Sequence, residues 1–494
     1  ILGAMSAADR SLTARRLARW AGPALGLMVY WLAPAELTPS ARRTLGVAVW
    51  MVTWWITECV PILTTSLLPL VLFPLLGISS TRESAAPYAN ELVFLFLAGF
   101  LLAAALERWN CHARIAYRMV LLVGFTGRRV VLGVMLATGF ISMWISNTAT
   151  AAMMLPIAMA IGGLFDRDQA GDDARTALML GVAYAASIGG MATLIGTPPN
   201  LVVAGAIREL TGTGISFAQF MALGLPITLV LLPACWVILT WVVFPVHAQI
   251  GGGGEQLLRD RLRQLGPVRG GEARVLLIFL AVVLAWFSRE HKDLGSVSLP
   301  GLVDLFPRLS DTAIGVGAAV LLFLVPGTTG DGGRRPLLTW EEARQIPWDV
   351  LFFFGGGLAL AQMMETTGLT TWLGGGLTHL GGLPPLVIYL GLAATVLVLS
   401  ELASNLAVAT MTMPIAVALG HSVGQPPVLL MLVAGFAAST GFALPIATPP
   451  NTIVFGSGMV TVRQMLRAGL WLDLVSVLVV AGMVWLLAPV VLGR

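Results

Sequence analysis

Two short polar strings interrupt otherwise apolar segments of the chain. They are Ser146-Asn147-Thr148, followed by Pro156, and Ser404-Asn405-Leu406, followed by Pro414. Hydroxyl and amide groups can hold anionic oxygens through neutral donors, and the oxygens of the same groups suit a hard monovalent cation. The two strings therefore predict two polar sites within apolar surroundings.

The second half of the chain repeats the first at two fixed offsets. At 258 residues the matches are Ser146 with Ser404, Asn147 with Asn405 and Glu91 with Asp349. At 251 residues, Gly196-Thr197-Pro198-Pro199-Asn200 falls on Ala447-Thr448-Pro449-Pro450-Asn451. Adjacent prolines remove backbone donors, so each string predicts a broken helix. Paired breaks in two halves are typical of inverted repeats around a binding site at the middle of a membrane.

The composition places these repeats in a bilayer. Hydrophobic residues make up 57% of the chain and charged residues 11%, against about 25% charged in soluble domains. The mean hydropathy is +0.86. Apolar runs of roughly 17–25 residues follow one another, which predicts an all-α polytopic membrane protein with about eleven transmembrane helices.

Two apolar segments differ from simple spans because each has the polar string at its centre. The arms of segments 130–163 and 384–420 are about 15–17 residues long, short for a full crossing, so we expect two re-entrant hairpins. The predicted organisation is an N-terminal arm with the first transmembrane helix (1–43), a first inverted repeat (44–245), a cytoplasmic linker (246–272) and a second inverted repeat (273–494).

Charge in the loops predicts the orientation. With a cytoplasmic N-terminus, 21 of the 29 Lys and Arg residues lie on the inner side, as the positive-inside rule requires. The net charge of +4 is thus explained by topology, and no nucleic-acid partner is expected. We expect a multi-pass protein of a bacterial inner membrane. Met5, after Ile1–Ala4, is the expected native start.

Other polar residues have open roles. Glu401 precedes the second string and either attracts a cation or couples a proton, or caps a helix or pairs within the scaffold. Trp144 either braces the first tip or packs as an ordinary core residue. The sequence contains no HExxH or phosphate-binding glycine motif, so we do not expect an enzyme.

The two Ser-Asn strings, the two TPPN-type breaks and the run Phe94–Phe100 resemble the divalent anion/sodium symporter family, over nearly the full chain. Bacterial members of that family carry di- and tricarboxylates. The resemblance implies a homodimer whose protomers each combine a scaffold domain with a transport domain that moves as an elevator. It also implies Na⁺ as the coupling ion, no organic cofactor and a small carboxylate anion as substrate, here of the C4-dicarboxylate class (succinate, malate, fumarate).

The resemblance further implies individual site residues. The implied substrate-binding positions are Ser146, Asn147, Thr148, Thr197, Pro198, Ser404, Asn405, Leu406, Thr448 and Pro449. The implied sodium ligands are Ser142, Ser146, Asn147 and Gly196 at one site and Ser400, Ala403, Asn405 and Ala447 at a second. Leu406 departs from the family, in which many dicarboxylate carriers have threonine. A Na⁺-independent exchanger and a citrate or sulfate carrier of the same fold remain alternatives.

Overall fold

The structure, a computed structural model, describes residues 7–165, 169–247, 254–268, 270–293, 298–329 and 333–493. These residues are predominantly helical, as the sequence predicts. The strands in this part of the chain form two short antiparallel pairs, β1 (Lys292–Asp293) with β2 (Ser298–Leu299) and β3 (Pro326–Thr328) with β4 (Arg334–Pro336). Met5, the expected native start, and Ile1–Ala4 before it lie outside the described residues.

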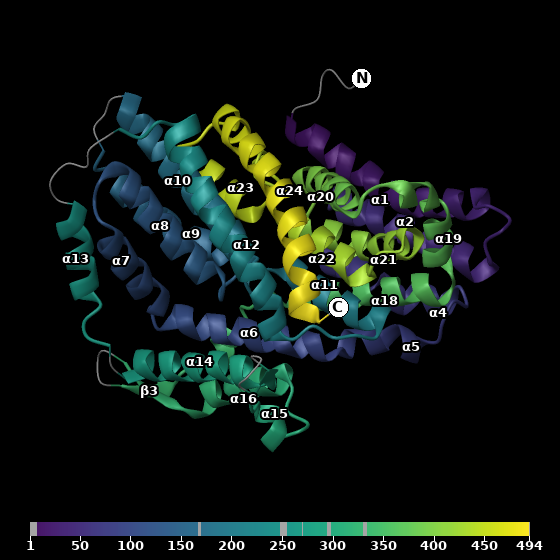
Figure 1. The fold of residues 1–494 in the computed structure, drawn as a ribbon, viewed down its shortest axis with the longest axis horizontal. Helices are drawn as coiled ribbons and strands as arrows, with labels where there is room; N and C mark the ends of the chain where they lie inside the picture. The colour runs from purple at the N-terminus through teal and green to yellow at the C-terminus, as the bar shows by residue number, and fades with distance from the viewer. Residues whose placement is uncertain are drawn as a thin grey trace.

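The first helices of the chain are α1 (Ala7–Leu32), α2 (Pro39–Thr57), α3 (Ile62–Ser66), α4 (Leu68–Leu75), α5 (Thr81–Ala85), α6 (Glu91–Arg108) and α7 (Cys111–Val123). Helices α1 to α5 lie at one end of the molecule, and α6 leads across it to α7 at the other end (Figure 1). Thr38 caps α2, since its hydroxyl accepts from Ala41 N at 3.1 Å. The apolar stretch 59–78 contains two short helices, α3 and α4. Pro69, near the start of α4, lacks the N–H that would continue the helix.

Six helical segments in the described residues are long and apolar enough to cross a membrane, and a bent pair makes a seventh. The bent pair is α18 (Trp348–Thr366) with α19 (Leu369–Gly375), which meet at 69°. Shorter apolar helices, such as α16 (Asp311–Leu324), lie beside them. The protein is therefore a multi-pass membrane protein, while the count of about eleven spans stays a prediction.

Each polar string lies at the turn of a helical hairpin. The first hairpin consists of α8 (Gly127–Ser142) and α9 (Asn147–Gly162), and the second of α20 (Pro385–Leu402) and α21 (Asn405–Val423). The arms of the second hairpin have 18 and 19 residues and are long enough to span. The predicted arm length was wrong there, because α20 runs to Leu402 and α21 continues past 420 to Val423.

The two TPPN-type strings break helices as predicted. Helix α10 (Gln169–Gly190) ends before the first string and α11 (Pro198–Thr211) begins inside it. In the second half, α22 (Pro427–Ala437) and α23 (Pro449–Gly456) are separated in the same way. Helix α22 is buried along its length from Val428 to Ala437, so these broken helices form the centre of the core.

The two halves interlock around that core (Figure 1). Within each half the broken helix packs on its own hairpin, α10 on α8 and α9 and α22 on α20 and α21. Across the halves, α9 packs on α23 and α21 on α11. Helix α12 (Phe217–Val237), extended by a π-helical turn (Ile238–Val243), packs on α24 (Val462–Leu492). These contacts between the halves bring both hairpins and both breaks together.

The remaining helices are α13 (Gly254–Gln264), α14 (Gly270–Ser288), α15 (Leu302–Leu305) and α17 (Trp340–Ala343). The predicted linker 246–272 contains α13, which packs on α7. Arg114 on α7 donates to Gly266 O at 2.9 Å and forms a buried ion pair with Glu272. The described part of the linker is thus anchored to the first half, while 248–253 and 269 lie outside the described residues.

Candidate functional site

The turn of the first hairpin gathers oxygen atoms. Asn147 Oδ1 lies 2.8 Å from Ser142 Oγ, and the same position is 3.1 Å from Ala186 O and 3.3 Å from Gly196 O. We call these four atoms the first oxygen cluster. Such a cluster is satisfied either when the amide turns to direct Nδ2 at the oxygens, or when a cation binds among them. The implied ligands Ser142, Asn147 and Gly196 therefore meet, and their donor set suits Na⁺.

The second hairpin repeats this arrangement. Ser400 Oγ lies 2.6 Å from Asn405 Oδ1 and 2.6 Å from Ala438 O. Ser400 and Asn405 match Ser142 and Asn147 at the 258-residue offset, and Ala438 takes the place of Ala186. These three atoms are the second oxygen cluster. Ala447, an implied ligand, lies near this cluster, beside Gly441. A Cβ atom added to Gly441 would lie 3.2 Å from Ala447 Cβ and 3.5 Å from Ser400 O, so the backbone of Gly441 approaches both residues.

The breaks themselves have matched geometry. Thr197 and Thr448 precede their helices in extended conformation, with φ −143° and −136°. The asparagine that ends each TPPN string then fixes the unwound segment, since Asn200 Nδ2 donates to Thr193 O at 2.7 Å and Asn451 Nδ2 to Leu444 O at 3.0 Å. The sequence repeat contains both asparagines, but we had not assigned them this role.

Close backbone approach explains one glycine at the first break. A Cβ on Gly190 would lie 2.1 Å from Asn147 Oδ1, closer than any side chain allows. Glycine therefore lets the end of α10 contact the hairpin tip directly. The side-chain amide of Asn147 also lies 3.4 Å from Thr197 Oγ1, so the tip and the first break form one site.

The other implied substrate residues line the outside of these clusters. Ser146 is half-buried and caps α9, with its Oγ accepting from Ala149 N at 3.4 Å. Thr197 and Thr448 are buried, and Thr448 Oγ1 accepts from Asn451 N at 3.3 Å. The others are partly or well exposed: Thr148 and Pro449 are exposed, and Pro198, Ser404 and Leu406 are half-buried. Ala403, an implied sodium ligand, is also half-buried.

Four helix N-termini meet this region: those of α9 and α21 at the tips and those of α11 and α23 at the breaks. The positive dipole ends of all four helices and the N–H groups of α9 and α21 favour an anion without a charged side chain in the membrane, whereas α11 and α23 begin with two prolines that have no N–H. The clusters offer oxygens to a cation beside them. In the described residues no hydrogen bond links the first cluster to the second; packing of α9 on α23 and of α21 on α11 holds them together.

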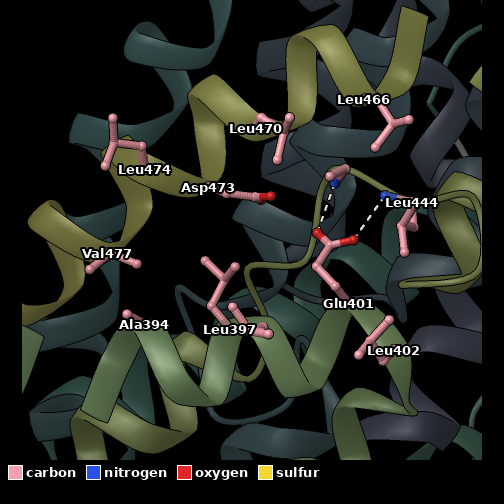
Figure 2. Close-up of a pocket in the computed structure, with 12 residues that line it drawn as sticks. Ala394, Leu397, Glu401, Leu402, Leu444, Leu466, Leu470, Asp473, Leu474 and Val477 are labelled. Carbon is pink, nitrogen blue, oxygen red and sulfur yellow. Dashed lines mark hydrogen bonds between the residues drawn. The ribbon is translucent and has the colours of Figure 1, made fainter. Parts of the chain in front are cut away.

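Sequence reasoning missed the acidic anchor of the second break. Glu401 accepts from Ala443 N and from Leu444 N, each at 2.8 Å, so it caps the unwound segment rather than a helix (Figure 2). Asp473 on α24 points toward the same segment and accepts from Phe442 N at 3.1 Å. Both carboxyl groups line an apolar groove of about 380 Å³. A carboxylate within an apolar run was the available signal for Asp473.

Known proteins match most of this chain. The sequence model of the family described as "Sodium:sulfate symporter transmembrane region" matches residues 18–492. The sodium-dependent dicarboxylate transporter SdcS of Staphylococcus saprophyticus is 40% identical over 480 residues, which cover 96% of this chain and 91% of the relative. A protein of the same name from Staphylococcus aureus is 39% identical with the same coverage.

Solved structures share the fold at low identity. MtrF of Neisseria gonorrhoeae, described as illuminating a class of antimetabolite efflux pumps, superposes with a TM-score of 0.54 at 13% identity, over 88% of this chain and 96% of its own. The YdaH transporter of Alcanivorax borkumensis gives 0.52 at 13% identity, over 83% and 88%. The relatives are transporters, which confirms that no enzyme is to be expected. The chain belongs to the sodium:sulfate symporter family, which is the divalent anion/sodium symporter family that its motifs resemble.

Proposed function

We propose that this protein is a secondary transporter that imports C4-dicarboxylates of the succinate, malate and fumarate class together with Na⁺. The observation that carries the proposal is the pair of matched oxygen clusters, one at each hairpin tip, beside helix N-termini that favour an anion. The names of the relatives support the same substrate and coupling ion.

Electrostatics accounts for the coupling. A dicarboxylate brings two negative charges into a region of low dielectric constant, where the interaction with a nearby cation is several times stronger than in water. The Ser146 and Ser404 hydroxyls and the N-termini of α9 and α21 would hold the carboxylate groups. The oxygens of the two clusters would hold Na⁺, whose charge offsets that of the anion. Substrate and ion would then bind well only together.

Transport requires that the site open to each side in turn. The two interlocked halves support an inverted repeat, with residues 44–245 and 273–494 as its units and the hairpins as re-entrant. In this proposal the hairpins and broken helices move as one elevator unit against the other helices, and the protein is a homodimer in a bacterial inner membrane with a cytoplasmic N-terminus.

The decisive experiment is accumulation of radiolabelled succinate by proteoliposomes under an imposed Na⁺ gradient. We expect accumulation above equilibrium with Na⁺ and none with choline, and loss of uptake in Asn147→Ala and Asn405→Ala. Full uptake in both variants would contradict the site, and uptake without Na⁺ would indicate an exchanger.

The residue Leu406 favours a second candidate substrate, citrate or sulfate. Leu406 cannot donate the hydroxyl hydrogen bond that Thr148 offers at the first tip, so the site is less polar on that side. Competition of succinate uptake by citrate and by sulfate separates the alternatives, since the preferred anion competes at the lowest concentration.

A further inference from the structure

Helix α12 packs on α8 and α10 of the proposed moving unit, so in this proposal it moves with them. Its start is fastened to helices outside that unit. Phe217 N donates to Asp311 Oδ2 on α16 at 2.9 Å, which satisfies a donor at the first turn of α12 with a carboxylate. The Phe217 ring stacks on Trp286 of α14, with ring centroids 4.2 Å apart, and Trp286 Nε1 donates to Asp311 O at 2.9 Å. Arg289 pairs with Asp311 at 2.6 Å and orients the carboxylate.

The first hairpin tip joins the same assembly. Trp144 lies against Phe217 with centroids 6.3 Å apart and meets Phe279 of α14 edge-on at 5.0 Å. Farther along, Arg208 on α11 forms an ion pair with Glu91 on α6. We call these contacts, between α11, α12 and the first tip on one side and α6, α14 and α16 on the other, the first seam. Trp144 therefore braces the tip against another helix.

The matching positions in the second half make no such seam. Trp144 matches Leu402, and their exposed fractions are 8% and 63%. The capping boxes Ser216/Gln219 and Thr461/Gln464 align α12 with α24, so Phe217 matches Val462, with exposed fractions of 0% and 41%.

The acidic residues differ in the same way. Glu91 pairs with Arg208 across the first seam. Asp349, its match, is exposed and makes no ion pair within the described part of the chain. The two halves, although related in sequence, thus differ at all three positions compared. The residues at the hairpin tip and at the helix start are buried only in the first half, and among the described residues the ion pair is formed only there.

We propose that the first seam is a closed gate, with Asp311 as the residue that positions it, and that the structure is the end state in which the first tip's side is shut. This inference rests on the proposed alternating access. In the orientation proposed above, the shut side is the outer one. The Arg289–Asp311 pair stays with α14 and α16, whereas the bond to Phe217 must break when the moving unit departs.

A polar cleft of about 490 Å³ adjoins the seam, with Arg208, Gln219 and Asp311 among its lining residues. Its polar walls give water a path to the freed groups, so the parted seam does not leave the Phe217 N–H and the Asp311 carboxylate unsatisfied in an apolar medium. A gate closed by a few polar bonds and one aromatic stack can open reversibly.

Crosslinking across the seam tests the proposal. In purified protein without Na⁺ or substrate, the double variant Glu91→Cys/Arg208→Cys is treated with a short bifunctional methanethiosulfonate. We expect efficient crosslinking that a reductant reverses. The matched pair Asp349→Cys/Met459→Cys, at the same offsets in the second half, is the control and should crosslink at least about tenfold more slowly.

Adding Asp311→Ala should slow the Glu91/Arg208 crosslink about tenfold, because the charged hydrogen bond across the seam is lost. Trp144→Leu, which installs the residue found at the matching tip, should act in the same direction and serves if Asp311→Ala does not fold. Equal crosslinking in both halves, or an unchanged rate in both added variants, would overturn the gate. Since the assay needs no transport, it can succeed even if the dicarboxylate or Na⁺ assignment fails.

Discussion

The two breaks share their oxygen clusters but are held in place by opposite chemistry. At the first, hydroxyls donate to carbonyls: Thr193 Oγ1 to Met143 O at 2.5 Å and Thr228 Oγ1 to Ile188 O at 3.0 Å. At the second, carboxylates accept from backbone N–H groups. Met143 matches Glu401 at the 258-residue offset, and the capping-box alignment matches Thr228 with Asp473.

This difference shows that an unwound segment in a membrane can be held either by side chains that donate to its carbonyl groups or by side chains that accept from its N–H groups. Both breaks have a carbonyl that accepts from the asparagine of the TPPN string, but only at the second do carboxylates accept from backbone N–H groups, those of Phe442, Ala443 and Leu444, within the described residues. Carboxylates bind N–H groups about twice as strongly as neutral acceptors do. We therefore expect the second break to depend more heavily on single side chains than the first.

The largest effect is expected for Glu401→Ala. The change leaves two buried N–H groups without an acceptor, which should lower the free energy of unfolding by about 3 kcal/mol. Thermal unfolding of the purified protein in detergent measures it. If this variant unfolds at the wild-type temperature, the carboxylate does not hold the second break.

A smaller loss is expected for Asp473→Ala. Only the Phe442 N–H loses its acceptor, and removal of one of the two acids that line the groove offsets part of the cost, so we expect about 1.5 kcal/mol. The same unfolding assay applies. A loss larger than that of Glu401→Ala would reverse the assigned order of the two anchors.

At the first break, Thr228→Val should cost only about 0.5 kcal/mol, because it keeps the shape of the side chain and Ile188 O retains a backbone role in its helix. Comparison with Asp473→Ala, at the matching position, tests the contrast directly. Equal losses for the two variants would mean that the breaks are held with the same strength.

Leu406→Thr should leave stability nearly unchanged, because the side chain is half-buried at a tip. It makes the second tip chemically equal to the first at Thr148. We expect succinate to compete better against citrate in uptake, by a few-fold, through one added hydrogen bond. An unaltered preference would place Leu406 outside the substrate's reach.

Much of the site could be predicted because its chemistry is local. Ser142 to Asn147 and Ser400 to Asn405 lie within single turns, and proline breaks a helix wherever it stands. The arms of the second hairpin were misjudged because α20 extends to Leu402, and α21 ends only where Gly424 adopts a left-handed conformation with φ 66°. Asp473 was missed because its partner, Phe442 N, is distant in sequence and no local pattern connects them.

By itself, the sequence determined a multi-pass helical membrane protein of this family, with two polar tips and two broken helices, since hydropathy, proline chemistry and the internal repeat act over short stretches. Only the tertiary structure decided which groups satisfy each break and which segments meet at the first seam. Both depend on contacts between distant segments, such as Phe217 with Asp311 and Glu401 with Ala443, and two halves of similar sequence can make different contacts of that kind.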